Sequence, residues 1–226
     1  MITLVRTVIA ILLILLPISS PLAGIVIGGT RVVFNGEKKE ASLSTKNPDD
    51  KPFLIQSWVE SYSGNDKPPF VITPPLFRLD QGKENIVRIV RTGGDLPEDR
   101  ESVFWLNIKS IPSSEQLSTN QLQITVKARI KLFYRPIGLN SSANATNAYK
   151  KLTFSNSTGQ VVVRNPTPYY VSFYHIDIDG KKINEPEMVP PLGSLSIRAT
   201  TSSNSKVSWQ AINDYGGITP MQSFLF

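Results

Sequence analysis

The chain consists of short β-rich runs that are separated by turn residues. Runs such as GTRVVFNG, SVFWLNIKSI and QVVVRN are rich in Val, Ile and Phe, and Gly, Pro, Asn or Asp often stand at their ends. No window of the mature sequence shows a sustained helical period. Short strands at this spacing predict an all-β fold made of antiparallel sandwiches rather than of strand–helix–strand units.

The N-terminal segment, residues 1–23, has the layout of a secretory signal peptide. Arg6 precedes an apolar run from Val8 to Leu16, and small and turn-forming residues follow up to Ala23. The run is too short to span a bilayer, and no cationic flank follows it, which disfavours the alternative of a membrane anchor. We therefore expect cleavage near Ala23, export, and no membrane insertion of the mature chain.

A change in composition divides the mature chain into two parts. Residues 138–149, GLNSSANATNAY, are rich in Ser, Asn and Ala, and strand patterning resumes at Leu152. Such a stretch is typical of a linker. We expect an N-terminal domain over residues 24–142 and a C-terminal domain over residues 143–226, each long enough to bury a core of its own.

The composition argues against an enzyme. The chain has no cysteine, which excludes thiolate metal sites and thiol catalysis, and its one histidine, His175, lies in an alternating strand pattern. No G-x-S-x-G elbow is present, and Asp177 and Asp179 indicate a hairpin corner rather than a metal loop. The net charge of +6 comes without a run of like charges, which disfavours a nucleic-acid partner. We expect no catalysis, no metal and no cofactor.

The stretch QLQITVKARIKLFYRP, residues 121–136, is typical of one long strand whose two halves differ. The apolar residues of the first half share one parity, so they line one face of a regular strand. They are Leu122, Ile124 and Val126. Alternation alone favours an ordinary core row, but the second half adds a cluster of cations that a core strand does not need. These cations are Lys127, Arg129, Lys131 and Arg135.

Six motifs in order along the chain give a closer identification. They are TRVVF at 30–34, TPPLFRLDQG at 73–82, LPEDRES at 96–102, IKLFYRP at 130–136, NPTPYYV at 165–171 and INDYGG at 212–217. Together they closely resemble the periplasmic pilus chaperones of the PapD type, across both expected domains. The resemblance implies two immunoglobulin-like β-sandwiches in an L shape with a cleft between them. It also implies a periplasmic chaperone that lends a strand to pilin subunits and delivers them to an outer-membrane usher.

The resemblance assigns roles to particular residues. It implies that Arg31 and Lys131 hold the pilin's C-terminal carboxylate, and that the row of Leu122, Ile124 and Val126 enters the pilin's open core. It further implies an interdomain salt bridge formed by Glu101, Arg135 and Asp214. One detail stays open at this point: Lys131 has the opposite parity to the apolar row, so the strand twists or bulges, or the carboxylate is reached from the other face.

Other features leave alternatives open. The loop at 111–120 is short and lacks a Cys pair, which resembles the subgroup with a short loop between the sixth and seventh strands of the first domain (the short F1–G1 loop). We expect Trp58, Trp105 and Trp209 to be core aromatics. The pilus served and any self-association of the free chain stay open. A secreted two-domain adhesin or receptor-binding module is the main alternative function, and a hydrolase or metal enzyme on a sandwich scaffold is the weaker one.

Overall fold

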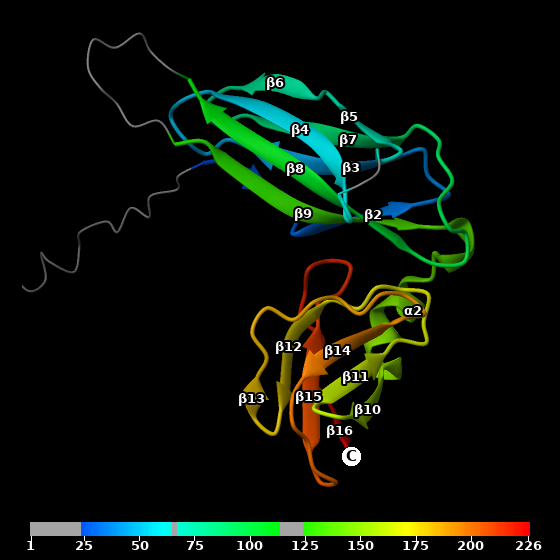
Figure 1. The fold of residues 1–226 in the computed structure, drawn as a ribbon. Helices are drawn as coiled ribbons and strands as arrows, with labels where there is room; N and C mark the ends of the chain where they lie inside the picture. The colour runs from blue at the N-terminus through cyan, green and yellow to red at the C-terminus, as the bar shows by residue number, and fades with distance from the viewer. Residues whose placement is uncertain (1–23, 65–66, 114–123) are drawn as a thin grey trace, which may run out of the picture.

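The computed structural model describes residues 24–64, 67–113 and 124–226, and it consists of two β-sandwiches joined by a helical connection (Figure 1). The signal peptide expected at 1–23 lies outside the described residues. In Figure 1 the strands of the first sandwich run across the view and those of the second run roughly along it. This confirms the predicted all-β fold of two domains set at an angle.

Among its described residues, the first sandwich is built from strands β1 to β9 in two sheets. One sheet has the order β1-β3-β7-β5, and the other has the order β2-β9-β8-β4-β6. All pairings are antiparallel except that of β2 with β9, which is parallel. The strands are β1 (Val26–Ile27), β2 (Arg31–Asn35), β3 (Glu40–Lys46), β4 (Phe53–Ser61), β5 (Phe70–Thr73), β6 (Leu76–Leu79), β7 (Glu84–Arg91), β8 (Ser102–Pro112) and β9 (Val126–Arg135).

The core of the first sandwich comes from alternate positions of facing strands. Leu106 and Ile108 of β8 and Leu132 of β9 are almost completely buried, together with Val87 and Ile89 of β7 from the other sheet. Because side chains alternate across a strand, the remaining positions of β8 and β9 point out of this core. That outer face of the five-stranded sheet carries the cations of β9, including Lys131.

The second sandwich holds a three-stranded sheet, β10-β11-β14, and a four-stranded sheet, β13-β12-β15-β16. Asp179 and Gly180 form the two-residue turn between β12 and β13, both with positive φ, which confirms the predicted hairpin corner. Trp209 is buried in the core, as expected, and packs on Phe154. The strands are β10 (Thr153–Ser157), β11 (Gln160–Arg164), β12 (Phe173–Ile178), β13 (Lys181–Lys182), β14 (Ser194–Arg198), β15 (Lys206–Ala211) and β16 (Gln222–Leu225).

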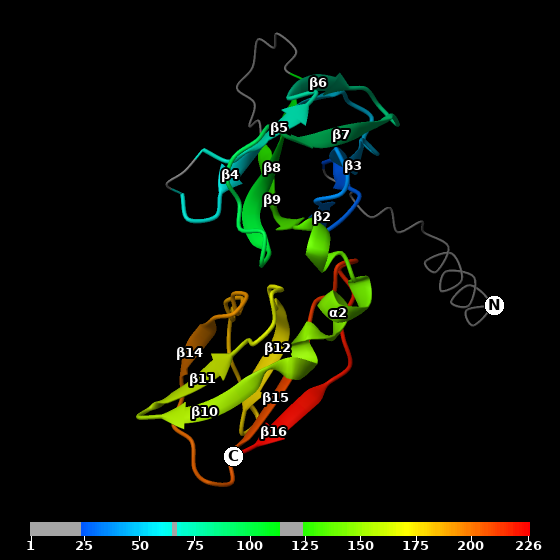
Figure 2. The same cartoon turned by 90° about the vertical axis from the view of Figure 1, so that its right-hand side faces the viewer.

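The segment expected to be a linker is helical and packed. It forms η1 (Ile137–Leu139), α2 (Ser142–Asn147) and η2 (Ala148–Lys151), and Figure 2 shows it running from the first sandwich to the second. The Ser141 side chain caps α2 by accepting from the backbone N–H of Asn144. Ala148 and Tyr149 are buried in the second core. We propose a domain boundary near residue 143, which falls inside this connection. None of the helices in the described ranges is long and apolar enough to cross a bilayer.

Two of the three tryptophans do not belong to a core, so that expectation was wrong for Trp58 and Trp105. Both are half-buried on the outer face of the five-stranded sheet. Trp58 pairs with Asn107 across β4 and β8, and Trp105 pairs with Lys131 across β8 and β9. Trp105 stacks on Tyr62, and the indole rings of Trp58 and Trp105 also pack against the side chains of Lys127 and Arg129.

Candidate functional site

Strand β9 presents a different set of residues to each side of its sheet. Leu132 and Tyr134 enter the core of the first sandwich, whereas Phe133 packs on Tyr170 and Met188 of the second domain. The pairing of β8 with β9 is regular over its whole length and contains no bulge. Lys131 therefore lies on the face opposite the even-numbered apolar row, which answers the question that its parity raised.

The first half of β9 has an open edge. β2 pairs only with residues 131–135, so among the described strands the segment Val126–Ile130 has β8 on one side and no partner on the other. Such an edge presents unpaired backbone N–H and C=O groups. The structure thus leaves the first half of β9 available for pairing with another chain.

The apolar row next to this edge is exposed. Ile124 is 67% exposed and Val126 is 50% exposed, while Leu122 lies outside the described residues. The interpretation of Ile124 and Val126 as an ordinary core row is therefore wrong for this chain on its own. The loop that suggested the short-loop subgroup lies partly in the undescribed range 114–123, and that assignment stays a prediction.

Arg31 and Lys131 are direct partners in the register of β2 and β9. Arg31 Nη1 donates to the carbonyl of Ile212 at 3.1 Å, and its Nε is buried without a partner in the described part of the chain. Within the same residues Lys131 has no ion pair. Burial lowers the pKa of Lys131, and the neighbouring charge of Arg31 lowers it further. Two cations side by side, neither of them in an ion pair within the described residues, are suited to hold an anion.

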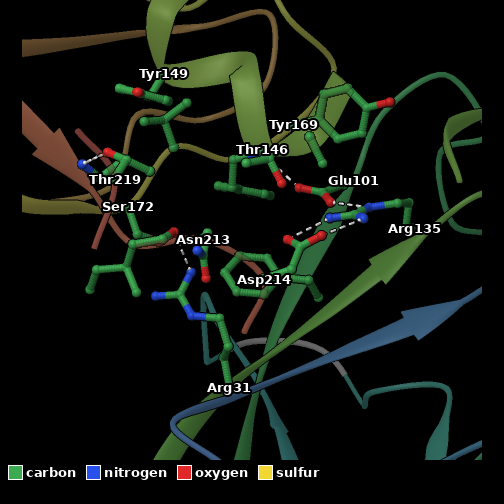
Figure 3. Close-up of a pocket in the computed structure, with 16 residues that line it drawn as sticks. Arg31, Glu101, Arg135, Thr146, Tyr149, Tyr169, Ser172, Asn213, Asp214 and Thr219 are labelled. Carbon is green, nitrogen blue, oxygen red and sulfur yellow. Dashed lines mark hydrogen bonds and ion pairs between the residues drawn. The ribbon is translucent and has the colours of Figure 1, made fainter. Parts of the chain in front are cut away.

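Glu101, Arg135 and Asp214 meet at the junction between the domains (Figure 3). Arg135 Nε donates to Glu101 at 2.7 Å, and its two terminal nitrogens donate to the two oxygens of Asp214 at 2.8 and 2.9 Å. Burial alone would lower the pKa of Arg135, but its bonds to both carboxylates outweigh burial and raise that pKa. The network links the last strand of the first domain to a loop of the second.

Glu101 also bridges the two domains through the backbone. Its Oε2 accepts from the N–H of Tyr170 at 2.8 Å, and its own N–H donates to the carbonyl of Pro168 at 2.9 Å. Burial raises the pKa of the Glu101 carboxyl, whereas the bonds from Arg135 and Tyr170 favour the ionised form. Arg31 reaches into the same junction, as Figure 3 shows, so Arg31 and the interdomain network are neighbours.

The sequence analysis did not identify Glu60 of β4, which organises the outer face. Its Oε1 accepts from Trp58 Nε1 at 2.8 Å and its Oε2 from Arg129 at 3.0 Å, with Lys127 Nζ at 3.8 Å from Oε1. The ring of Trp58 lies under Lys127, and that of Trp105 lies under Arg129. The signal in the sequence is only that Trp58 and Glu60 share a strand face. Their proximity to β9 depends on the order of β9, β8 and β4 in the sheet.

Comparisons with known proteins give one family for both domains. Residues 24–140 match the family model described as "Pili and flagellar-assembly chaperone, PapD N-terminal domain", and residues 147–223 match "Pili assembly chaperone PapD, C-terminal domain". The chain is 43% identical to chaperone protein LpfB of Salmonella typhimurium, over 92% of this chain and 91% of the relative. It is 40% identical to chaperone protein FimC of Escherichia coli K12, over 88% of this chain and 83% of the relative.

A solved structure agrees with these sequence relatives. The fold is similar to a chain of the Salmonella enterica SafA pilin in complex with the SafB chaperone, with a TM-score of 0.80 and 32% sequence identity. The match covers 92% of this chain and 99% of the other. The likeness therefore extends through both sandwiches and through the connection between them.

Proposed function

This chain belongs to the family of PapD-type pilus-assembly chaperones, and from that premise we propose that it binds pilin subunits by lending them strand β9. The observation that carries this proposal is the open edge of β9 over Val126–Ile130, beside the exposed side chains of Ile124 and Val126. An edge with free backbone groups and an exposed apolar row is what strand addition requires.

The lent strand acts on a pilin whose own sandwich lacks a strand. Backbone groups of β9 pair with the edge of the pilin's groove, and the apolar row of Leu122, Ile124 and Val126 fills that groove. Full burial contributes roughly 1.5–3 kcal/mol for each such side chain. Both partners gain, because the pilin's core is covered and the chaperone's exposed row leaves water.

Arg31 and Lys131 provide the anchor for the pilin's C-terminal carboxylate. The bound carboxylate supplies the acid that both cations lack in the described residues of the free chain, and a charge-assisted bond of this kind is stronger than a neutral one. Pinning the chain end also sets the register. A slip of one residue would turn every apolar side chain of the strand away from its pocket.

The chaperone works by binding alone, without a catalytic step or a nucleotide, in the periplasm. Residues 1–23 direct its export and are removed. The Glu101–Arg135–Asp214 network holds the angle between the domains, so that the anchor and the lent strand face the subunit together. The loaded complex is delivered to an outer-membrane usher, where another subunit's extension replaces β9.

The test is co-purification from the periplasm with a pilin encoded beside this chain. The pilin is expressed either intact or without its last few residues. We expect a one-to-one complex with the intact pilin and its loss with the truncated one. Failure to form a complex with any neighbouring pilin would contradict strand lending and favour the stand-alone adhesin module instead.

A further inference from the structure

Three cations occupy successive positions on the outer face of β9. Lys127, Arg129 and Lys131 are each two residues apart, which separates neighbouring members by about 6.6–6.8 Å along a strand. This spacing raises a problem for a chaperone that sets register by anchoring a carboxylate. A slip of two residues keeps every side chain on its correct face, so the alternation of the apolar row does not oppose it as it opposes a slip of one.

Two of these three cations, Lys127 and Arg129, interact with the same acid, Glu60. Glu60 lies 3.0 Å from Arg129 and 3.8 Å from Lys127, and its carboxylate is fixed by the bond from Trp58 Nε1. The side chains of Glu60, Lys127 and Arg129 are 37%, 42% and 46% exposed, so an incoming carboxylate could otherwise reach both cations. The Trp58 bond and the two cations lower the pKa of Glu60, which keeps it ionised.

Lys131 is excluded from this arrangement. In the cross-strand row it is separated from Glu60 by Trp105, which pairs with Glu60 on one side and with Lys131 on the other. The next cation on the same face, Arg135, is occupied by Glu101 and Asp214. Among the described residues, Lys131 is therefore the one cation of this face of β9 without an acid.

We propose that Glu60 is a register-selecting residue, which occupies Lys127 and Arg129 so that the pilin's carboxylate docks only at Lys131 and Arg31. The proposal rests on the strand-lending function above and adds a residue to it. Without Glu60, Arg129 becomes a second docking point, and the subunit binds in a mixture of two registers that differ by two residues. Trp58 and Trp105 position Glu60 and Arg129. Trp58 donates to the carboxylate of Glu60, and the ring of Trp105 lies under Arg129.

The register can be read directly, because the chain contains no cysteine. Ala128→Cys then gives the chaperone a single thiol. It is tested against single cysteine substitutions made one at a time along the groove-edge strand of a pilin encoded beside this chain. Disulfides form when the Cα atoms lie about 4.4–6.8 Å apart, so a shift of two residues changes which pilin position crosslinks. We expect one dominant crosslink with the parent chain, and with Glu60→Gln a second crosslink displaced by two pilin residues.

A suppressor and a control sharpen the test. Adding Lys127→Gln and Arg129→Gln to Glu60→Gln removes the competing cations, and the single crosslink of the parent should return. Glu40→Gln is the matched control, because it removes an exposed carboxylate that pairs with Arg88 on the other sheet, and it should leave one crosslink. In addition, Lys131→Ala should reduce pilin recovery less in the Glu60→Gln background than in the parent chain. If Arg129 substitutes fully for Lys131, the two reductions should differ by about tenfold.

Failure of this inference is distinct from failure of strand lending. If the parent forms the complex and Glu60→Gln keeps the single parental crosslink, Glu60 does not select register and the inference is overturned. If the parent itself forms no complex with the pilin, the strand-lending function is what fails. A Glu60→Gln chain that crosslinks in two registers, and that the two added substitutions return to one, supports both.

Discussion

Arg31 and Lys131 lie opposite each other on the parallel strands β2 and β9, so that backbone pairing holds two like charges side by side. Within the described residues, no ion pair relieves Lys131. Such a pair is unfavourable in the free chain and becomes favourable when an anion arrives between its members. Holding these two charges side by side thus lowers the stability of the free protein.

Removing either member of this pair should abolish capture of subunits. We expect Lys131→Ala and Arg31→Ala to reduce recovery of co-expressed pilin by at least about tenfold, because each loses a charge-assisted bond to the carboxylate. The measurement is the yield of complex, with circular dichroism to show that both variants are folded. Lys38→Ala removes an exposed lysine nearby and should leave the yield unchanged. Equal recovery from all three variants would contradict the anchor.

The same pair predicts a variant that is more stable but inactive. Lys131→Met keeps the stem and removes the half-buried charge, so we expect the melting temperature at pH 7 to rise by about 2–4 °C, which corresponds to about 1 kcal/mol. Recovery of pilin should be lost. Lys39→Met, at an exposed lysine, is the control and should leave the melting temperature unchanged.

The stability gain of Lys131→Met should depend on pH in a defined direction. Burial and Arg31 lower the pKa of Lys131 in the folded chain, so folding disfavours its protonated form. The parent therefore gains stability as pH rises from that lowered pKa toward about 10.4, the pKa of an unfolded lysine. Thermal unfolding at pH 7 and pH 10 should show the difference between parent and variant becoming smaller. A constant or growing difference would show that the charge of Lys131 is not the cause.

A charge in the lent row should block binding without unfolding the chaperone. Ile124 is 67% exposed in the free chain, so Ile124→Asp costs little there, but it places an unpaired carboxylate in the pilin's core. We expect pilin recovery to fall by at least about tenfold with an unchanged melting temperature. Ile86→Asp, at a residue 52% exposed on β7, is the control. A similar loss with Ile86→Asp would mean that surface hydrophobicity in general, and not the β9 row, drives capture.

Breaking the interdomain network should destabilise the chain. Arg135→Met removes the cation that bonds both Glu101 and Asp214, and removing one partner of a buried ion pair costs about 3–5 kcal/mol. Urea unfolding measures this loss. Arg100→Met removes an exposed pair with Asp99 and should leave the unfolding free energy nearly unchanged. Equal effects from the two variants would contradict a special role for the buried network.

The sequence predicts the strands and the domain architecture well, because alternation and turn residues are local signals. The face of Lys131 stayed open in the sequence, because a bulge would have changed the alternation, and the regular pairing of β9 with β8 places Lys131 on the face opposite to Val126. The helical connection was missed, since six residues of α2 are too few to show a helical period and its stability comes from packing against the second core.

The role of Glu60 was beyond sequence reasoning for a different reason. Glu60 and Arg129 are far apart in sequence, and they meet because β8 lies between β4 and β9 and the two side chains lean across it. Strand order is not encoded in the alternation of any one strand. The same holds for Trp58 and Trp105, whose size suggested a core but whose strand parity places them outside it.

The parallel pairing of β2 with β9 joins the beginning of the first domain to its last strand. Contacts between such distant parts of a chain form late, because loop closure must precede them. The anchor that we propose for Arg31 and Lys131 therefore requires the first domain to be closed from its second strand to its last. We expect a copy of the chain in which β2 has not yet paired with β9 to lack the paired cations, so that complete folding of this domain precedes capture of a subunit.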